Sequence, residues 1–321
     1  MDGWIDLIVA EIGSETPLIR TIELRAPEGG SLPSWAAGAH IKVRLPDGDH
    51  RSYSLVNLSA APAVIASPAS YLLGVRLEEP GTGGSRYMHA LKQGDHVAVS
   101  APTNNFALEP GTGRVTLVAG GIGITPIASM IAQLVGEQRP FRAFYAGRSA
   151  DQLAFHGKLA ALAGNHLNFH YDDRAGILDI KPIMSGLDAD EPIYVCGPRP
   201  MIDAAIRIAA ELGWPARRLR FEIFAAAEPR AGDTSFEVVL ASSGRVLAIP
   251  PDKSILDVLI EAGVDPMFDC RRGDCGICQT GVLEGTPDHR DFILSDAERA
   301  AGKLMQICVS RARTPRLVLD L

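Results

Sequence analysis

Four of the five cysteines in this 321-residue chain have a spacing that suits an iron–sulfur cluster. Cys270, Cys275 and Cys278 lie in the run CRRGDCGIC, a C-x4-C-x2-C pattern, and Cys308 follows 30 positions after the third. This is the spacing of a plant-type [2Fe–2S] site, in which four thiolates hold two irons. The two glycines of the run let the backbone bend around a cluster and turn N–H groups toward its sulfurs. The expected chemistry is the transfer of one electron at a time.

Two other uses of these cysteines are possible. A structural zinc site is the first alternative, although zinc sites more often show paired C-x2-C units. Disulfides are the second and weaker one, because the number of cysteines is odd and the opening residues, MDGWIDLIVAEIG, lack the basic segment of a secretory signal. The fifth cysteine, Cys196, belongs to a different motif.

A second group of residues suits a flavin. In the run RSYS, Arg51 can neutralise a phosphate, Tyr53 can lie on an isoalloxazine ring or ribityl chain, and Ser54 can hydrogen-bond near flavin N5. The later run GTGGSRYMH (Gly81–His89) has the features of a helix N-terminus with N–H groups free for a phosphate. Each run alone also fits an ordinary strand or a glycine-rich turn, so the pair carries the prediction.

Two more runs indicate a nicotinamide nucleotide. GGIGITP (Gly120–Pro126) follows an apolar strand and opens a helix, where glycines let a pyrophosphate approach the backbone and proline suits helix position N1. CGPRPM closes a later strand, so Cys196 either faces the ligand crevice or is a small core residue. Phe224, in RFEIF, either stacks on the flavin where the nicotinamide arrives or belongs to the core.

Two groups of polar residues each fit more than one role. Arg148 and Ser149 follow a strand of the nucleotide segment and contact either the adenosine ribose, its 2′-phosphate or solvent. The run TPDHRD, which contains Asp288, His289 and Arg290, is interpreted as a charged turn at the surface or between domains. The eight histidines show no metal-ligand spacing.

The elements that must position these residues fall into three segments. Residues 1–107 contain short strands, such as His40–Leu45 and His96–Ser100, between turn sequences, which predicts a barrel or a sandwich. Residues 108–224 alternate apolar strands with helices, which predicts a parallel sheet with helices on both faces. Its strands are expected at Arg114–Ala119, Phe141–Gly147, Leu167–Asp173 and Pro192–Gly197, with helices near Pro126 and at DAAIRIAAELG.

The last third begins with a predicted linker at residues 225–235, AAAEPRAGDTS, which is small, polar and broken by proline and glycine. Residues 236–321 open with a hairpin and a helix, for which Ser254 and Asp257 predict a capping box and Gly263 predicts the end. The cysteine run follows directly. Hairpin, helix and cysteine loop together resemble the β-grasp fold of plant-type ferredoxins.

Composition narrows the class of protein. A hydrophobic content of 46% and a charged content of 21% are ordinary for a globular enzyme. The sequence has no apolar run near the ~18 residues that span a bilayer, so we expect no membrane segment and a cytoplasmic location. A net charge of −7 argues against nucleic acid as a partner.

RSYS, GGIGITP, CGP and the four-cysteine pattern occur in an order that resembles the phthalate dioxygenase reductase family, including vanillate O-demethylase reductase subunits. The resemblance covers essentially the whole chain, including TPDHRDFILSDAE and the final LVLDL. It implies a multidomain protein with an FMN-binding antiparallel β-barrel, an α/β parallel-sheet NAD domain and a β-grasp [2Fe–2S] ferredoxin domain. Arg199 and Pro200 depart from the small residues that relatives often carry there, which puts cofactor affinity in doubt.

The resemblance also implies site residues. The flavin contacts would be Arg51, Ser52, Tyr53, Ser54, Val75, Arg76, Gly84, Ser85 and Phe224. The nucleotide contacts would be Gly120, Gly121, Gly123, Thr125, Cys196, Gly197 and Pro198. The catalytic group around the two rings would be Ser54, Thr125, Cys196 and Phe224. The metal ligands would be Cys270, Cys275, Cys278 and Cys308.

The function that the resemblance implies is an NADH-dependent reductase that passes electrons through FMN and a [2Fe–2S] cluster to a Rieske-type terminal oxygenase. A monomer is expected. From Ala226 to Leu321 there are 11 Lys or Arg against 15 Asp or Glu, which favours an electropositive patch on the partner. One alternative is a flavin reductase or an FAD-type ferredoxin reductase that uses the cluster internally. The other is a redox-sensing or structural zinc protein without turnover.

Overall fold

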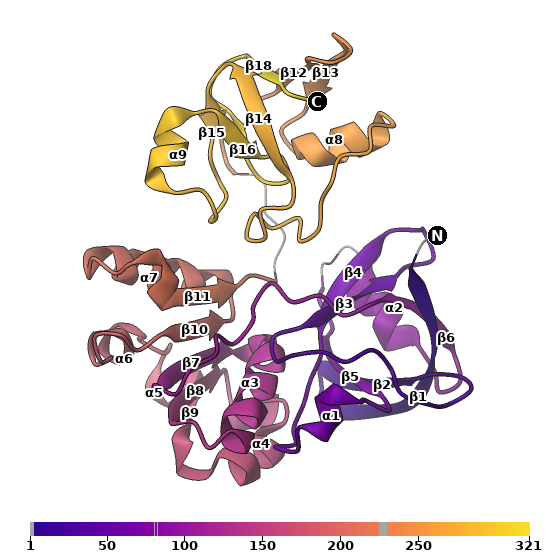
Figure 1. Ribbon diagram of the computed structural model, residues 1–321, viewed down its shortest axis with the longest axis vertical. Coiled ribbons are helices and arrows are strands. Elements are labelled where there is room, and N and C mark those ends of the chain that lie inside the picture. Colours follow the sequence, from indigo (N-terminus) through magenta and orange to yellow (C-terminus); the bar gives the residue numbers. More distant parts are fainter. Residues whose placement is uncertain (1–2, 80, 82, 225–229) are drawn as a thin grey trace. The chain divides into compact units, whose positions relative to one another are not determined.

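The computed structural model describes residues 3–79, 81, 83–224 and 230–321 (Figure 1). Internal contacts divide the chain into two compact units, residues 1–222 and residues 223–321. None of the helices in the described residues is long and apolar enough to cross a membrane.

The first unit begins with a six-stranded antiparallel sheet in the order β4-β3-β6-β1-β2-β5. Its strands are β1 (Trp4–Thr16), β2 (Ile19–Arg25), β3 (His40–Arg44), β4 (His50–Ser54), β5 (Tyr71–Arg76) and β6 (His96–Ser100), accompanied by α1 (Ala63–Ala66) and α2 (Gly84–Ala90). Beyond β4, Leu55 bridges to Leu73 and the Val56 N–H donates to the Leu72 carbonyl at 2.9 Å, so the sheet edges close into a barrel.

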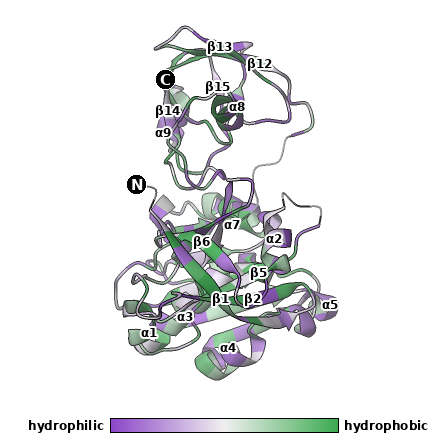
Figure 2. Ribbon diagram, turned by 90° about the vertical axis from the view of Figure 1, so that its right-hand side faces the viewer, coloured by the Kyte–Doolittle hydropathy of each residue, from purple (hydrophilic) through white to green (hydrophobic). Residues whose placement is uncertain are grey.

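Alternation of side chains builds the interior of this barrel. In β6, Val97 and Val99 are buried, whereas His96 is exposed. Figure 2 shows hydrophobic and hydrophilic stretches along the strands of the barrel. Because successive strand residues point to opposite faces, this period of two places one apolar face inward. The predicted strand at residues 96–100 coincides with β6, and β3 ends one residue before the predicted Leu45.

The second half of this unit is a five-stranded parallel sheet in the order β11-β10-β7-β8-β9. Its strands are β7 (Val115–Gly120), β8 (Phe141–Gly147), β9 (Leu167–Tyr171), β10 (Ile193–Cys196) and β11 (Leu219–Glu222). Its helices are α3 (Ile124–Gly136), α4 (His156–Ala163), α5 (Asp172–Ala175), α6 (Lys181–Ser185) and α7 (Arg199–Glu211), with 3-10 turns η1 (Gly121–Gly123), η2 (Ala150–Gln152), η3 (Gly164–His166) and η4 (Ala216–Arg218). Chain order reverses between β7 and β10, which makes their carboxyl ends the topological switch point.

Three predicted boundaries in this sheet were wrong. Helix α3 begins at Ile124, so Pro126 lies at the third helical position and not at N1. Strand β9 ends at Tyr171, because the next two aspartates form the first turn of α5. Helix α7 begins at Arg199, before the predicted DAAIRIAAELG, since Pro200 has a backbone angle that suits a first helical turn.

Hydrogen bonds join the barrel to the parallel sheet. The Ser129 hydroxyl on α3 accepts from the Asn57 N–H and donates to the Leu55 carbonyl, both at 2.8 Å. The Glu15 carboxylate on β1 accepts from the Phe155 N–H and from Lys158, both at 2.9 Å. The predicted boundary at residue 107 therefore lies inside one compact unit.

The second unit contains a five-stranded sheet in the order β13-β12-β18-β14-β16 (Figure 1). Its strands are β12 (Phe236–Leu240), β13 (Val246–Ile249), β14 (Gln279–Glu284), β16 (Leu304–Gln306) and β18 (Arg316–Leu319), with a short pair β15 (Pro287–Asp288) and β17 (Arg311–Ala312) and helices α8 (Ile255–Glu261) and α9 (Asp296–Ala301). Helix α8 buries Ile255, Leu256 and Leu259 in a core shared with the sheet. This hairpin, helix and mixed sheet form the predicted β-grasp arrangement.

The predicted caps of α8 are confirmed. The Asp257 N–H donates to the Ser254 hydroxyl at 3.1 Å, and the Ser254 N–H donates to the Asp257 carboxylate at 3.2 Å. Gly263 follows the C-cap residue Ala262 with φ 75°, a left-handed conformation that favours glycine. The cysteine loop begins soon after this helix, so the cap also fixes where that loop starts.

The predicted charged turn TPDHRD is not a surface feature. The Arg290 side chain is 10% exposed and its guanidinium donates to both Asp233 carboxylate oxygens, at 2.8 and 2.5 Å. Arg311 donates to the Thr234 carbonyl at 3.2 Å. These charges are buried because they neutralise each other. Asp233 and Thr234, assigned to the linker, are thus held by the second unit, whereas residues 225–229 of that linker lie outside the described residues.

Replacing Asp233 with asparagine should weaken the second unit. Hydrogen bonds from Arg290 lower the pKa of Asp233 to about 2. Because the folded pKa is below the unfolded one, the stabilisation is fully present above about pH 4 and is lost as the pH falls toward 2. We therefore expect D233N to lose about 2 kcal/mol at every pH between 6 and 8. The measurement is the urea concentration at which half of the visible absorbance is lost. D265N, at an exposed position, is the matched control. Equal midpoints for both variants and the parent would contradict a stabilising role of the Asp233–Arg290 pair.

Candidate functional site

The two glycine turns of the parallel sheet touch each other at the switch point. A Cβ atom on Gly123 would lie 2.2 Å from the Cys196 carbonyl oxygen and 2.7 Å from the Gly197 nitrogen. One on Gly120 would lie 2.6 Å from Pro198 Cδ. In contrast, one on Gly121 would meet nothing within 4 Å. The turns predicted to bind a nucleotide are therefore brought together where parallel sheets bind ligands, and glycine is required on the side where they meet.

Thr125 connects this crevice to the barrel. It is 2% exposed, and its hydroxyl donates to the Ile122 carbonyl at 3.0 Å. A Cβ atom on Gly74 in β5 would lie 2.9 Å from Thr125 Cγ2. The first turn of α3 thus packs directly against the barrel strand that carries Val75, a residue predicted to contact the flavin.

The two runs predicted to form the flavin site also meet. A Cβ atom on Gly84, at the start of α2, would lie 2.6 Å from Arg51 Cγ and 3.4 Å from the Tyr53 hydroxyl. Arg51 donates to the Asp49 carboxylate at 2.5 Å. Burial raises the pKa of Tyr53 above its ordinary range, although the positive charge of Arg51 acts to lower it. A cation, a partly buried phenol and a helix start without a Cβ therefore line one region, a donor set that fits a flavin phosphate and its chain.

The remaining predicted flavin residues surround the same region. Ser54 is 6% exposed at the end of β4, and Ser52, opposite Lys42 in the sheet, is half-buried. The Ser85 hydroxyl accepts from the Glu78 N–H at 3.1 Å. Arg76 pairs with the Glu78 carboxylate at 2.9 Å, so β5 and α2 are tied together through Glu78. Flavin contact by these residues stays a prediction.

Glu222 ends β11, and Phe224 follows two residues later. Phe224 is half-buried and belongs to the second unit, so its stacking on a flavin stays a prediction. Glu222 was missed by the sequence analysis. It is 4% exposed and lies in parallel register with Cys196, which is fully buried. A carboxylate at the carboxyl end of a predicted parallel strand was the available signal, and it adds a buried carboxylate to that edge of the sheet.

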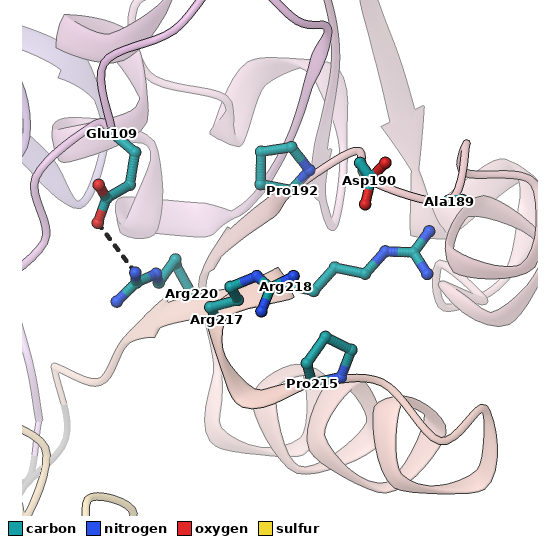
Figure 3. A pocket seen from close by; sticks show the side chains of 8 residues that line it. All are labelled: Glu109, Ala189, Asp190, Pro192, Pro215, Arg217, Arg218 and Arg220. Carbon is teal, nitrogen blue, oxygen red and sulfur yellow. Dashed lines mark hydrogen bonds and ion pairs between the residues drawn. The ribbon is translucent and has the colours of Figure 1, made fainter.

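A pocket at the opposite edge of the parallel sheet is not part of this site (Figure 3). It is lined by Glu109, Ala189, Asp190, Pro192, Pro215, Arg217, Arg218 and Arg220. Arg220 pairs with Glu109 at 2.9 Å, and Arg218 donates to the Glu191 carbonyl at 3.2 Å and stacks on Trp214. Since it lies at the amino ends of β10 and β11, it is remote from the glycine turns that follow β7 and β10.

Three side-chain contacts link the four predicted ligand cysteines within the second unit. Hydrogen bonds with the Cys275 and Cys308 thiols lower the pKa of Cys270, and a hydrogen bond with Cys308 lowers that of Cys278. The sulfurs thus form a continuous series from Cys275 through Cys270 and Cys308 to Cys278. In the described part of the chain, no three His, Cys, Asp or Glu side chains are arranged around one point as for a single metal ion.

The loop between these cysteines is shaped around their sulfurs. The Arg272 N–H donates to Cys270 Sγ at 3.3 Å. Gly273 and Gly276 have φ values of 80° and 79°, and a Cβ on Gly273 would lie 2.6 Å from Val309 Cγ2. Only glycine suits such positions, so the loop can turn back and present an N–H group to a thiolate. Four thiols with a backbone donor directed at one of them fit a [2Fe–2S] cluster.

Comparison with known proteins agrees with this division of the chain. Residues 117–207 match the oxidoreductase NAD-binding domain family and include both glycine turns. Residues 238–313 match the 2Fe-2S iron-sulfur cluster binding domain family and include all four predicted ligands. The chain is therefore an oxidoreductase with a nucleotide-binding sheet and an iron–sulfur domain.

Relatives extend the similarity to the barrel. The chain is 41% identical to tetrachlorobenzoquinone reductase of Sphingobium chlorophenolicum, covering 99% of this chain and 98% of that one. It is 39% identical to vanillate O-demethylase oxidoreductase of Pseudomonas sp. strain HR199, covering 99% and 100%. A solved phthalate dioxygenase reductase, described as a modular structure for electron transfer from pyridine nucleotides to [2Fe–2S], superposes with a TM-score of 0.76 at 36% identity, covering 100% and 98%. With this identity along essentially its whole length, the chain belongs to the phthalate dioxygenase reductase family.

Proposed function

We propose that this chain is the NADH-dependent reductase component of an oxygenase system, with FMN as its flavin and a Rieske-type oxygenase as its electron acceptor. The observation that carries the proposal is the contact of Thr125 with Gly74, which joins the nucleotide turn to the barrel wall. A hydride donor bound at the turn and a flavin bound at the barrel would then share one border. The names of the relatives, which include reductase subunits of dioxygenases and monooxygenases, support the choice of partner.

In this proposal the glycine turns bind and orient NADH. The N–H groups after β7 would hold the pyrophosphate at the start of α3, where the helix dipole favours negative charge. The open space beside Gly121 would admit it. Cys196 and Thr125 would flank the nicotinamide and set the distance over which the hydride moves, and the buried Glu222 would orient its carboxamide. No group of the protein needs to act as a general acid or base.

The barrel residues would fix the flavin. Arg51 would neutralise its phosphate beside Gly84 and Ser85, Tyr53 would pack against its ribityl chain, and the buried Ser54 would hydrogen-bond near N5. When bound, FMN supplies the conversion of an electron pair into single electrons. FMN is proposed over FAD because the family resemblance implies it, and Arg51 beside Gly84 would be the one cation that its terminal phosphate needs.

The cysteine loop would be the exit for electrons. Cys270, Cys275, Cys278 and Cys308 would ligate the [2Fe–2S] cluster, and the Arg272 N–H would donate to one ligand sulfur. From Ala226 to Leu321 acidic residues exceed basic ones, 15 to 11, which favours a partner with a positive patch. Transfer to the oxygenase is then expected to slow as salt is added.

We further propose that the chain is a monomer in the cytoplasm.

Flavin identity and turnover test this function. Mass spectrometry of the released flavin should give FMN, and the purified protein should reduce cytochrome c with NADH, at a higher kcat/KM than with NADPH. FAD in the extract would overturn the flavin assignment, and a preference for NADPH would overturn the nucleotide assignment. A colourless protein that does not reduce cytochrome c would favour the zinc or sensor alternative.

A further inference from the structure

One buried polar side chain beside the cysteine loop has no role in the function proposed above. Gln306, the last residue of β16, is 0% exposed. Its Oε1 lies 3.5 Å from Cys278 Sγ, and its Nε2 donates to Gln279 Oε1 at 3.2 Å. Gln279 pairs with Gln306 across β14 and β16 and is exposed to solvent. The amide therefore lies between a predicted cluster ligand and a side chain that can rotate.

The direction of the contact with Cys278 depends on the state of the sulfur. A thiol donates its proton to Oε1, as the structure describes, but a thiolate ligand is only an acceptor. An amide oxygen facing a thiolate would be repelled and would leave a buried acceptor without a donor. The oxygen and the NH2 group of an amide are nearly the same size, so a half-turn places Nε2 on the sulfur and Oε1 toward Gln279. Gln279, being exposed, can turn its own NH2 group to donate in return.

We propose that Gln306 donates its side-chain N–H to the Cys278 thiolate and thereby raises the reduction potential of the cluster. The inference rests on the proposed function, because it takes Cys278 as a cluster ligand. Reduction adds negative charge that the ligand sulfurs share, so a donor at a sulfur stabilises the reduced form more than the oxidised form. The residue acts through Cys278 and sets the driving force for electron entry from the flavin.

Substitution of Gln306 separates this role from a merely structural one. Q306M removes the donor and keeps a flexible side chain of similar length. We expect the equilibrium constant for reduction of its cluster to fall about tenfold. For a one-electron couple this corresponds to a reduction potential that is lower by about 59 mV. Q279A, which leaves the Gln306 donor in place and lets water donate to its Oε1 at this exposed position, is the matched control and should shift the potential by much less. The readout is spectroelectrochemical titration of the whole holoprotein, with cluster content measured from the reduced EPR signal.

A second measurement needs no change in the residue tested. In the Q279A background Gln306 is the one glutamine left among residues 223–321 of the sequence. Labelling glutamine side chains with 15N should give a nitrogen coupling to the reduced cluster in pulsed EPR. An unchanged potential in Q306M, or no 15N coupling in a protein with a full cluster, overturns the proposal. A protein without any cluster signal instead overturns the proposed function.

Discussion

Replacing Cys275 with serine will abolish cytochrome c reduction while NADH still bleaches the flavin. Cys275 is one end of the series of sulfurs in the second unit, and its thiol contacts Cys270. Loss of one of four thiolates removes the cluster or its function, so we expect electron delivery to fall by at least ~100-fold. The first unit contains the glycine turns and the RSYS strand, and it has no part in that loss. Stopped-flow bleaching of the flavin and steady-state cytochrome c reduction measure the two steps separately.

The matched control for this substitution lies two residues away. Ile277 stands between two predicted ligands, yet its side chain is 46% exposed. I277A should therefore keep the cluster and most of the cytochrome c activity. If C275S retained cytochrome c reduction at the rate of I277A, electrons would be leaving directly from the flavin, and the proposed order of transfer would be wrong.

Replacing Gly123 with alanine will block the first step. The added methyl group would lie 2.2 Å from the Cys196 carbonyl oxygen, which is backbone and cannot move without shifting the turn after β10. The nicotinamide would then be displaced relative to the flavin. Because a displacement of about 1 Å in a reacting pair costs roughly a hundredfold in rate, NADH-dependent bleaching should slow by about that factor.

Two observations isolate this effect from misfolding. Dithionite should still reduce both the flavin and the cluster of G123A, because neither site is changed. G157A is the control variant, since its Cβ would meet nothing within 4 Å and Gly157 lies in the same half of the chain, on α4. Bleaching of G123A by NADH at the rate of the parent would refute the assignment of this turn to the nucleotide.

Local signals in the sequence account for what could be predicted. Strand β8 was predicted to the residue, at 141–147, because an apolar run between a proline and a polar turn has few other solutions. The capping box of α8 was predicted because both of its side chains are three positions apart. The predicted starts of helices were less accurate, as at Pro126. A 3-10 turn precedes α3, and no residue type in the sequence predicts it.

Contacts between distant residues account for what could not be predicted. The burial of Arg290 depends on Asp233, 57 positions earlier, so TPDHRD alone looked like a solvated turn. The contact of Gly74 with Thr125 joins two folds whose relative placement is not written in either motif. Glu222 was missed for a similar reason, because its alignment with Cys196 follows from strand pairing across the sheet. The sequence thus predicted which residue types form the site, but it did not predict which residues lie next to them in the fold.

The place of β18 in the second sheet has a consequence for how the protein is made in the cell. This strand, Arg316–Leu319, lies between β12 and β14 at the centre of the sheet, yet it is synthesised after every other strand in it. Strands β12 and β14 have no central partner until the ribosome has passed residue 319. Since domains fold as units during synthesis, the first unit can fold while the second is still incomplete. Iron delivery should therefore come late, when translation has passed Cys278 by 41 residues and Cys308 by 11.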